Sequence, residues 1–436
     1  MDFDLIKKIN TIAIPGILST LLNTIFTLAD EAIVGRLDVD GYTAVSISAN
    51  LIYQIIGNIG VISIVFAIMF AKSIGSKDEK KCNEIYNSLI TISSIIGVII
   101  VLMSCLIGKT LLRQIYGISG SILKEAYLYL CISSFTVGLN LMCFIMSSFF
   151  KNIFKPRITL LATGISLPIN FFVDYILVFG KLGFPKMRVA GAAIGTVVGV
   201  LVELSIFIIY FVKESKIKFK FCISLDVFSD AIKMFIPLLG QDIIENTLFI
   251  IIVGAIITRY STALYASYSV IVSIITSINI IIYAYAGANM TIVGQSFSDK
   301  DKRKKCVIIP IYTSVFILII FLPLLICSFL FPNQICGLIT NQSMIITTAV
   351  SILSFAFIMN LLNIPCQVYK YALQSIGKER YTFISTGVSS VISCLCLYLF
   401  VDFFKLELLG VFCAYGILYV ILNILFIKKY ICALRQ

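Results

Sequence analysis

Histidine is absent from the 436 residues of this chain, and charged residues make up only 13% of it. Without histidine, the usual ligand of a zinc site and the usual base beside a catalytic serine or cysteine are missing. No other nucleophile constellation stands in its place, so we predict that the protein is not an enzyme. Soluble domains carry about 25% charged residues, so the low charge content also excludes an ordinary soluble fold.

Cysteine is present, but the spacing typical of a metal or redox site is missing. The chain has 13 cysteines and no CxxC pair, and Cys105, Cys131 and Cys143 lie inside apolar runs. The simplest interpretation of a cysteine in such a run is that it serves as a small apolar helix residue. We therefore expect no disulfide or zinc role for these residues, and no cofactor.

Long apolar runs are what the chain has in place of charge. Hydrophobic residues make up 59% of it. Runs of about 20 residues recur from end to end, which is enough to cross a hydrocarbon core of roughly 30 Å as helices. They do not alternate as the strands of a membrane barrel do. The sequence predicts an all-α polytopic membrane protein of twelve spans, at residues 12–35, 44–70, 86–108, 122–148, 158–180, 190–212, 233–257, 263–294, 306–330, 344–369, 382–404 and 408–428.

The basic residues predict how these spans are oriented. The net charge is +12, and most of the 34 lysine and arginine residues fall on the cytoplasmic side if both termini are cytoplasmic. This is the positive-inside distribution of an inner-membrane protein. The positive charge is thus explained by topology, and we expect no nucleic-acid partner. Residues 1–10 lead into the first span without a small-residue cleavage site, so we also expect no cleaved signal peptide.

The second half of the chain repeats the first. AIPGILSTLL around Pro15 returns as FIPLLGQDII around Pro237, GSKDEKKC returns as SDKDKRKKC, and KPRITLLATGIS returns as KERYTFISTGVS. The offset is about 222–224 residues in all three cases. Six spans per copy make the repeat parallel, which is typical of transporters with a site between the halves. We predict two lobes, at residues 1–214 and 215–436.

Acidic residues inside the spans differ between the two copies. Charged groups inside a membrane are costly and usually face a cavity, so chemistry is expected where only one copy keeps them. Asp30 and Asp174 have no acidic counterpart in the second half. At 1.5 Å per residue, both lie roughly 25 Å from the inner end of their spans. Asn170 lies one turn from Asp174 on the same face. The span of Thr196 starts at the outer side of the membrane, and Thr196 lies near that end.

These four residues predict a cation-coupling site, formed by Asp30, Asn170, Asp174 and Thr196. Carboxylate, amide and hydroxyl oxygens are the hard ligands that Na⁺ needs. Two carboxylates that share a site also suit a proton carrier, and the sequence does not decide between Na⁺ and H⁺. The alternative is that each acid is a buried structural group satisfied by its neighbours. Thr196 can also bond to its own helix backbone.

A second candidate site centres on Glu245, near the middle of the seventh span. There it would attract a cationic substrate or a second coupling ion, and Asp242, one turn earlier, is its expected partner. Other polar and aromatic residues suit the wall of such a site: Gln54, Asn50, Asn363 and Tyr265. Interhelical hydrogen bonds explain the amides nearly as well. Glu203 is a weaker candidate, and Glu31 is expected at the lipid interface.

Several motifs resemble the multidrug and toxic compound extrusion (MATE) family. DEAIVGRL, which begins at Asp30, is similar to that family's first-helix signature. So are NFFVDYILVFG from Asn170, VAGAAIGT up to Thr196, and IPLLGQDIIENTLF and TIVGQ in the second half. The resemblance covers essentially the whole chain. The stretch QSIGK resembles Gram-positive bacterial members.

The resemblance implies a fold and a function. Members of the family have twelve helices in two pseudo-symmetric six-helix lobes that form a V, and they export drugs in exchange for sodium or proton entry. Carried over residue by residue, the cation network of their N-terminal lobe falls on the four residues above. The glutamate of their seventh helix falls on Glu245. Some members carry an acid in the tenth helix where this chain has Asn363, so we expect an incomplete C-lobe cation site.

We therefore predict a monomeric secondary active multidrug exporter that works by alternating access and is driven by Na⁺ or H⁺. Its expected partners are cationic or amphipathic small molecules and the lipid bilayer of the bacterial cytoplasmic membrane. A lipid-linked saccharide flippase is the alternative, although such proteins usually carry basic residues in the central cavity, whereas the mid-span charges here are mainly acidic. Neither Gly108-Lys109-Thr110 nor Gly377-Lys378 has the earlier glycine that the phosphate-binding loop of an ATPase requires.

Overall fold

The computed structural model describes residues 3–299 and 301–435. Lys300, which belongs to the repeated loop motif, lies outside the described residues. Twelve helical segments in the described part are long and apolar enough to cross a membrane. They coincide with the twelve predicted spans, so the predicted all-α polytopic fold is confirmed. Most are longer than predicted, because a helix continues past the apolar run to keep its backbone groups hydrogen-bonded.

The chain divides into two compact units. The first, called the N unit, comprises Ile14–Phe235. The second, called the C unit, combines the residues up to Ala13 with those from Ile236 onward. The predicted repeat boundary between residues 214 and 215 stays a prediction. Both unit boundaries fall inside a helix, close to the paired prolines Pro15 and Pro237.

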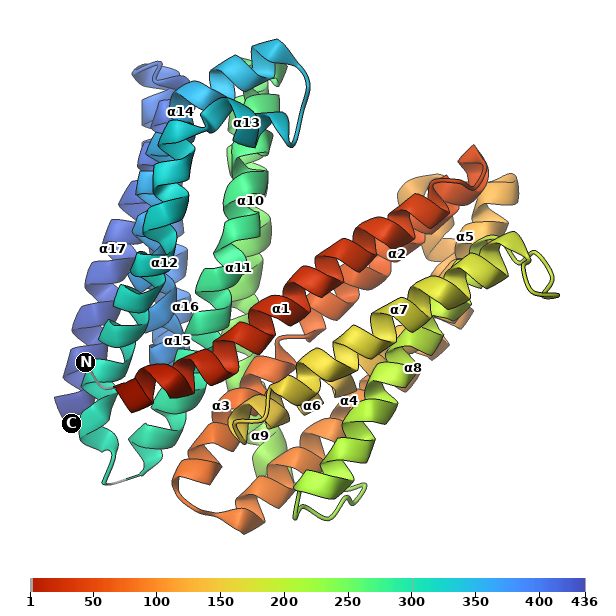
Figure 1. Cartoon of the computed structure of the whole chain (residues 1–436), viewed down its shortest axis with the longest axis horizontal. Helices are drawn as coiled ribbons and strands as arrows, with labels where there is room; N and C mark the ends of the chain where they lie inside the picture. Colours follow the sequence, from red (N-terminus) through yellow and green to blue (C-terminus); the bar gives the residue numbers. More distant parts are fainter. Residues whose placement is uncertain (1–2, 300, 436) are drawn as a thin grey trace. The chain divides into compact units, whose positions relative to one another are not determined.

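The N unit is a bundle of helices drawn from red to green in Figure 1. It contains most of α1 (Phe3–Val34), then α2 (Val39–Ile59), α3 (Ile62–Gly75), α4 (Glu79–Tyr116), α5 (Gly120–Ser133), α6 (Phe135–Asn152), α7 (Arg157–Phe179) and α8 (Val189–Glu214). Helices α7 and α8 run side by side as the most closely packed pair of the unit (Figure 1).

The C unit is the second bundle and also receives the first turns of α1. Its elements are the second part of α9 (Leu225–Ile243), from Ile236 onward, then η1 (Ile244–Leu248), α10 (Phe249–Tyr260), α11 (Thr262–Ser298), η2 (Arg303–Val307), α12 (Ile308–Leu330), α13 (Pro332–Gly337), α14 (Ser343–Leu361), α15 (Asn363–Ser375), α16 (Glu379–Tyr398), η3 (Leu399–Phe403) and α17 (Glu407–Arg435). The start of α1 is tied to this unit by Tyr285, whose hydroxyl donates to Asn10 Oδ1 at 2.8 Å.

Several spans that read as continuous are interrupted. The second span breaks between α2 and α3, the fourth between α5 and α6, and the tenth between α14 and α15. Pro365 lies in the first turn of α15 and has no N–H to continue the ladder of α14. At the other breaks, hydroxyls bond to the freed carbonyls: Ser63 Oγ donates to Gly60 O at 2.8 Å, and Ser134 Oγ to Cys131 O at 2.7 Å.

Two segments widen into π-helical turns. The first is η1, which contains Glu245, and the second is η3. Such turns are rare, and they are found frequently at functional sites. Widening the helix by one residue redirects the side chains of that turn relative to the rest of the span. The seventh span is therefore irregular at the point where its mid-membrane acid lies.

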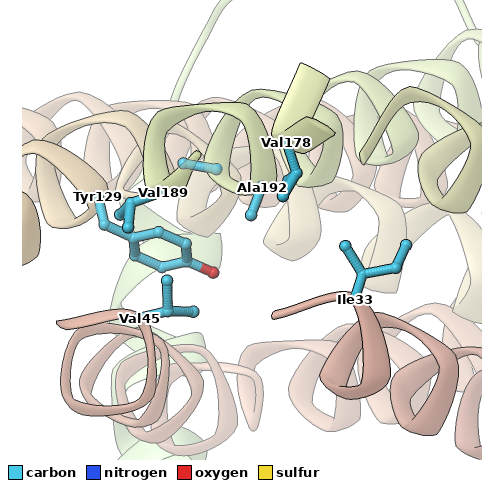
Figure 2. Packing of buried hydrophobic residues seen from close by; sticks show 7 residues of the cluster. Ile33, Val45, Tyr129, Val178, Val189 and Ala192 are labelled. Carbon is cyan, nitrogen blue, oxygen red and sulfur yellow. The ribbon is translucent and has the colours of Figure 1, made fainter. Parts of the chain in front are cut away.

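An apolar cluster closes one end of the N unit. Figure 2 shows side chains of this cluster, which come from α1, α2, α5, α7 and the start of α8. Its buried members are Ile33, Val45, Tyr129, Val178, Val189, Ala192 and Ala193. At the same end, Arg188 pairs with Asp38 and, at 3.3 Å, with Glu125. The cluster and these ion pairs join α1, α2, α5, α7 and α8.

Candidate functional site

A row of glycines in α8 brings the first candidate site together. Gly191, Gly195 and Gly199 recur every four residues and so lie on one face of the helix. A Cβ atom at Gly195 would lie 1.8 Å from Asp174 Oδ1, and one at Gly199 would lie 2.6 Å from Asn170 Cβ. Only glycine leaves room for these two polar side chains against the backbone of α8. We call this contact of α7 and α8 the glycine seam.

The two acids of the N unit lie within electrostatic range of each other. The charge of Asp30 acts on Asp174, and both charges act on the hydroxyls of Tyr53 and Tyr129. Asp174 is 3% exposed. Asp30 Oδ1 and Asp174 Oδ1 are both buried without a hydrogen-bond partner among the described residues. No ion pair joins either acid to a lysine or arginine of the described chain.

Asn170 and Thr196 lie on the faces expected of them. Asn170 is buried one turn below Asp174, on the side of α7 that meets the glycine seam. Thr196 Oγ1 donates its proton to Ala192 O of its own helix at 3.0 Å. This bond uses the hydroxyl proton and leaves the oxygen lone pairs free to accept. The structure therefore shows the backbone bond that the sequence left open, and this bond does not prevent Thr196 from offering an oxygen to a cation.

The apolar cluster of Figure 2 lies one helical turn from these polar groups. Ile33 follows Asp30 by three residues and Val178 follows Asp174 by four, so each lies on the same face as its acid. Ala192 precedes Thr196 by four residues. Apolar packing on this side keeps the local dielectric low and strengthens every charge interaction at the acids.

The weaker candidates of the first half are either hydrogen-bonded elsewhere or exposed. Glu203 lies further along α8, and its Oε1 accepts a hydrogen bond from Thr163 Oγ1 at 3.0 Å. Glu31 is exposed, as expected for a side chain that points away from Asp30. Asn50 and Gln54 are both exposed on α2 of the N unit.

In the C unit, Glu245 is held by a network of donors. Its Oε1 accepts from Gln241 Nε2 at 2.9 Å and from Thr386 Oγ1 at 3.4 Å. Its Oε2 accepts from Lys370 Nζ at 2.7 Å. Gln241 is itself fixed, because its carbonyl oxygen accepts from Gln374 and Thr382. The carboxylate is thus satisfied on both oxygens by three different helices.

Lys370 was missed in the sequence analysis and changes the picture of this site. The tenth span was predicted to end at residue 369, and Lys370 was grouped with the loop that follows. Helix α15 continues to Ser375, and the Lys370 side chain is only 8% exposed. Amides precede and follow it at helical spacing, at Gln367 and Gln374, and this pattern could have revealed a buried polar stripe. The interior of the C unit therefore contains a base as well as an acid.

Asp242 and Glu245 have different hydrogen-bond partners, although the charge of Glu245 acts on Asp242. Asp242 Oδ1 accepts from Asn246 Nδ2 at 2.7 Å, and the partner of Glu245 is Lys370. One turn of spacing places Asp242 next to Asn246 on its own helix, whereas Lys370 reaches Glu245 from across the unit. Sequence spacing alone identifies the first kind of neighbour and not the second.

Glu245 lines a cavity of about 200 Å³ inside the C unit. Its wall includes aromatic residues of α10, α11 and α17 and amides of α11, α14 and α15: Phe249, Tyr283, Phe412, Asn279, Asn360 and Gln367. The amides also bond to one another, and Asn363 accepts from Gln367 at 3.0 Å. Asn363 and Tyr265 do not line the cavity, and Tyr265 packs instead against Tyr268.

The profile of one protein family, described as MatE, matches residues 15–176 and 237–399. These two stretches make up well over half of the chain. The chain belongs to the MatE family. The matches in this MatE protein begin 222 residues apart, which is the offset of the three repeated motifs. They include Asp30, Asn170 and Asp174 in the first copy and Glu245 and Lys370 in the second, whereas Thr196 lies outside them.

Curated relatives of this MatE protein include staphylococcal proteins. One is the multidrug export protein MepA of Staphylococcus saprophyticus, 24% identical over 389 residues, which covers 87% of this chain and 84% of the relative. Another is MepA of Staphylococcus aureus, 24% identical over 392 residues, with 88% and 85% covered. The similarity spans nearly the whole of both chains and agrees with the Gram-positive resemblance of the QSIGK stretch.

Solved structures share the fold of this MatE protein. A MATE family multidrug resistance transporter described in an outward-facing conformation is 19% identical, with a TM-score of 0.85 and 98% of this chain and 96% of that chain covered. A transporter of the MOP superfamily from Pyrococcus furiosus, described as having a binding pocket of reverse polarity, is 20% identical, with a TM-score of 0.84 and 99% and 96% covered. At this identity the likeness concerns the fold.

Proposed function

We propose that this MatE protein is a secondary active exporter that couples entry of Na⁺ or H⁺ to export of cationic or amphipathic small molecules. One observation carries the coupling part of the proposal. Asp174 is buried and Asp30 is half-buried, the two lie within electrostatic range of each other, and each has a buried carboxylate oxygen without a hydrogen-bond partner in the described chain. Two such charges inside a membrane repel each other and lack solvation, so a bound cation or proton would stabilise them.

The residues at this place fit either ion. Two carboxylates, the Asn170 carbonyl and the Thr196 hydroxyl provide the oxygen ligands that a hard cation prefers. The same pair of carboxylates can share one proton between them. Tyr53 and Tyr129 lie close enough to interact with the charged state. The names of the staphylococcal relatives, which are multidrug export proteins, support the proposal that this protein exports drug molecules.

Helix α1 could transmit the effect of ion binding to the affinity for the exported molecule. It carries Asp30 in the N unit, while its turns up to Ala13 belong to the C unit. Pro15 lies at this division and cannot donate a backbone hydrogen bond, so α1 can bend there at low cost. We propose that neutralising Asp30 and Asp174 changes the favoured position of α1 and lowers the affinity for the exported molecule. The linkage must be reciprocal, so bound substrate must lower the affinity for the ion.

Efflux from proteoliposomes tests this function. The full chain is reconstituted with a fluorescent organic cation, and a sodium gradient and a pH gradient are imposed separately. We expect one of the two gradients to drive efflux. We expect Asp174→Asn to reduce that efflux at least about 100-fold, because the neutral amide has no negative charge for the coupling ion to neutralise. Asp301→Asn is the matched control, since Asp301 is an exposed acid outside the spans.

Two outcomes would overturn the proposal. Gradient-driven efflux that persists in Asp174→Asn would show that coupling lies elsewhere. Movement of a lipid-linked saccharide without any cation efflux would select the flippase. The buried Lys370 is the one feature that favours the flippase, but its charge is already neutralised by Glu245.

A further inference from the structure

The cavity of the C unit has an aromatic wall and one charged edge. Phe249, Tyr283, Phe412 and Tyr419 provide flat apolar surface, and Glu245 provides the charge. Aromatic faces attract cations, and a carboxylate strengthens that attraction. Judged from the lining residues alone, the cavity would therefore select positively charged ligands.

The ion pair at the edge of the cavity cancels the part of this preference that comes from the carboxylate. Lys370 Nζ lies 2.7 Å from Glu245 Oε2, and the two side chains are 8% and 23% exposed. At this distance in a poorly solvated place, the positive and negative charges largely cancel for any ligand further away. Lys370 Nζ also lies 5.4 Å from the centre of the Tyr371 ring, which helps to hold the ammonium in place.

The surrounding hydrogen bonds show that this pair is built in. Gln241 and Thr386 both donate to Glu245 Oε1, the oxygen that Lys370 does not contact, and Gln374 and Thr382 orient Gln241. A carboxylate with all of these donors has little capacity left for a metal cation. Its ammonium partner is attached to α15 and cannot leave with a ligand. Asp30 and Asp174 of the N unit have no such basic partner among the described residues.

We propose that Lys370 determines the charge specificity of the C-unit cavity by acting as a tethered counter-cation for Glu245. The cavity then binds small aromatic ligands of either charge with similar affinity and holds no coupling ion. Export of such ligands rests on the function proposed above, whereas their binding does not.

Two single-ring ions of matched size and opposite charge test this specificity. Phenyltrimethylammonium and benzenesulfonate are each titrated by calorimetry into the purified full chain in neutral detergent. The quantity of interest is the ratio of the two dissociation constants, because micelle partitioning and cavity size affect both ions alike. We expect the ratio of the unmodified protein to lie within about three-fold of one.

Substitutions of the pair should move the ratio in opposite directions. Lys370→Gln leaves Glu245 uncompensated and should shift the ratio about ten-fold or more toward the cation. Glu245→Gln leaves the lysine uncompensated and should shift it about ten-fold or more toward the anion. The double variant with both glutamines should restore the original ratio. Exchanging the two residues, Glu245→Lys with Lys370→Glu, should also restore it, because the pair is retained.

Two further variants control for the place of binding. Lys151→Gln removes a lysine of α6 in the N unit and should leave the ratio unchanged. Ser390→Phe fills the cavity from α16 and should abolish binding of both ions. Binding that survives Ser390→Phe would place the ligands elsewhere and overturn the proposal.

The proposal is also overturned if Lys370→Gln is folded and keeps the original ratio. If that variant does not fold, Glu245→Gln decides the matter, and an unchanged ratio there has the same meaning. These measurements use no ion gradient and leave Asp174 intact. Their failure can therefore be told apart from a failure of the coupling experiment.

Discussion

The buried acids of the two units differ in what neutralises them. In the C unit, Glu245 is paired with Lys370 and accepts hydrogen bonds from two further side chains. In the N unit, Asp30 and Asp174 lie within electrostatic range of each other, and each keeps an oxygen without a partner in the described chain. The C unit therefore supplies its own cation beside Glu245, whereas no lysine or arginine of the described chain pairs with Asp30 or Asp174.

Under the proposed function, this difference gives the two copies of a repeated scaffold different tasks. The two copies share their helix order, and the matched stretches begin 222 residues apart. A self-contained ion pair can stay charged throughout a transport cycle, so it suits a wall that contacts the exported molecule. A pair of acids without a base changes its charge whenever an ion arrives or leaves, so it suits coupling. The predictions below test this contrast between the units.

The largest effect is expected for the ion pair. Lys370→Gln leaves a buried carboxylate without its counter-charge, and we expect it to lower the free energy of unfolding by about 3–5 kcal/mol. Thermal unfolding in detergent checks this with a thiol-reactive dye, which reports on the buried Cys143 and Cys366. Replacing Glu245 by glutamine as well should recover most of the loss. A double variant as unstable as the single one would show that Lys370 acts through packing and not through charge.

The glycine seam comes next. Gly195→Ala places a Cβ atom 1.8 Å from the position of Asp174 Oδ1, so the acid must move. We expect a loss of about 2–3 kcal/mol together with impaired coupling. Gly57→Ala in α2 is the control, because a Cβ atom there meets nothing within 4 Å. It should leave stability equal or slightly raised. Equal effects of the two substitutions would mean that the seam does not position Asp174.

A smaller effect is expected for Thr196. Thr196→Val keeps the shape of the side chain but removes an oxygen ligand. We expect the concentration of coupling ion at half-maximal efflux to rise about ten-fold. Thr196→Ser keeps the hydroxyl and should stay within about three-fold of the unmodified protein. Similar values for valine and serine would exclude Thr196 from the ion site and leave it as a helix residue bonded to Ala192.

The smallest effect is expected at the edge of the N unit. Partial desolvation works to raise the pKa of Asp38, but the hydrogen bond and charge of Arg188, together with backbone hydrogen bonds at Gly41 and Asp38, lower it by more, so this pKa lies below its ordinary value. A carboxyl group whose pKa is lowered in the folded state stabilises the fold at pH values above its unfolded pKa of about 3.9. This stabilisation is lost as the pH falls through the folded pKa. Arg188→Ala should therefore lower the unfolding temperature at pH 7 by less than about 2 °C, because the pair is solvated. The difference from the unmodified protein should disappear below about pH 3.

Hydropathy predicted the twelve spans because the membrane imposes a minimum length of apolar helix on any chain that crosses it. The ends of the helices were harder to predict from hydropathy, because helical backbone hydrogen bonds continue past the last apolar residues. The break at Leu362 follows from a local feature, Pro365, and was still overlooked. Hydropathy averages over a window and does not register a single missing N–H.

The candidate site could be predicted in part. Asp30 and Asp174 stood out because the second copy of the repeat lacks them, and Asn170 followed from its helical spacing to Asp174. The glycine seam was present in the quoted motif VAGAAIGT, yet the contact it makes depends on which helix faces it. Lys370 was lost to a misplaced helix end, and its partner Glu245 lies 125 residues away.

The sequence by itself determined the membrane fold, the repeat and the asymmetry of its acids. These follow from composition, from spacing along one helix and from comparison of the chain with itself. Only the tertiary structure decided which acid has a base beside it. An ion pair between α15 and the η1 turn depends on how distant helices pack, and nothing in the local pattern of either segment specifies the other.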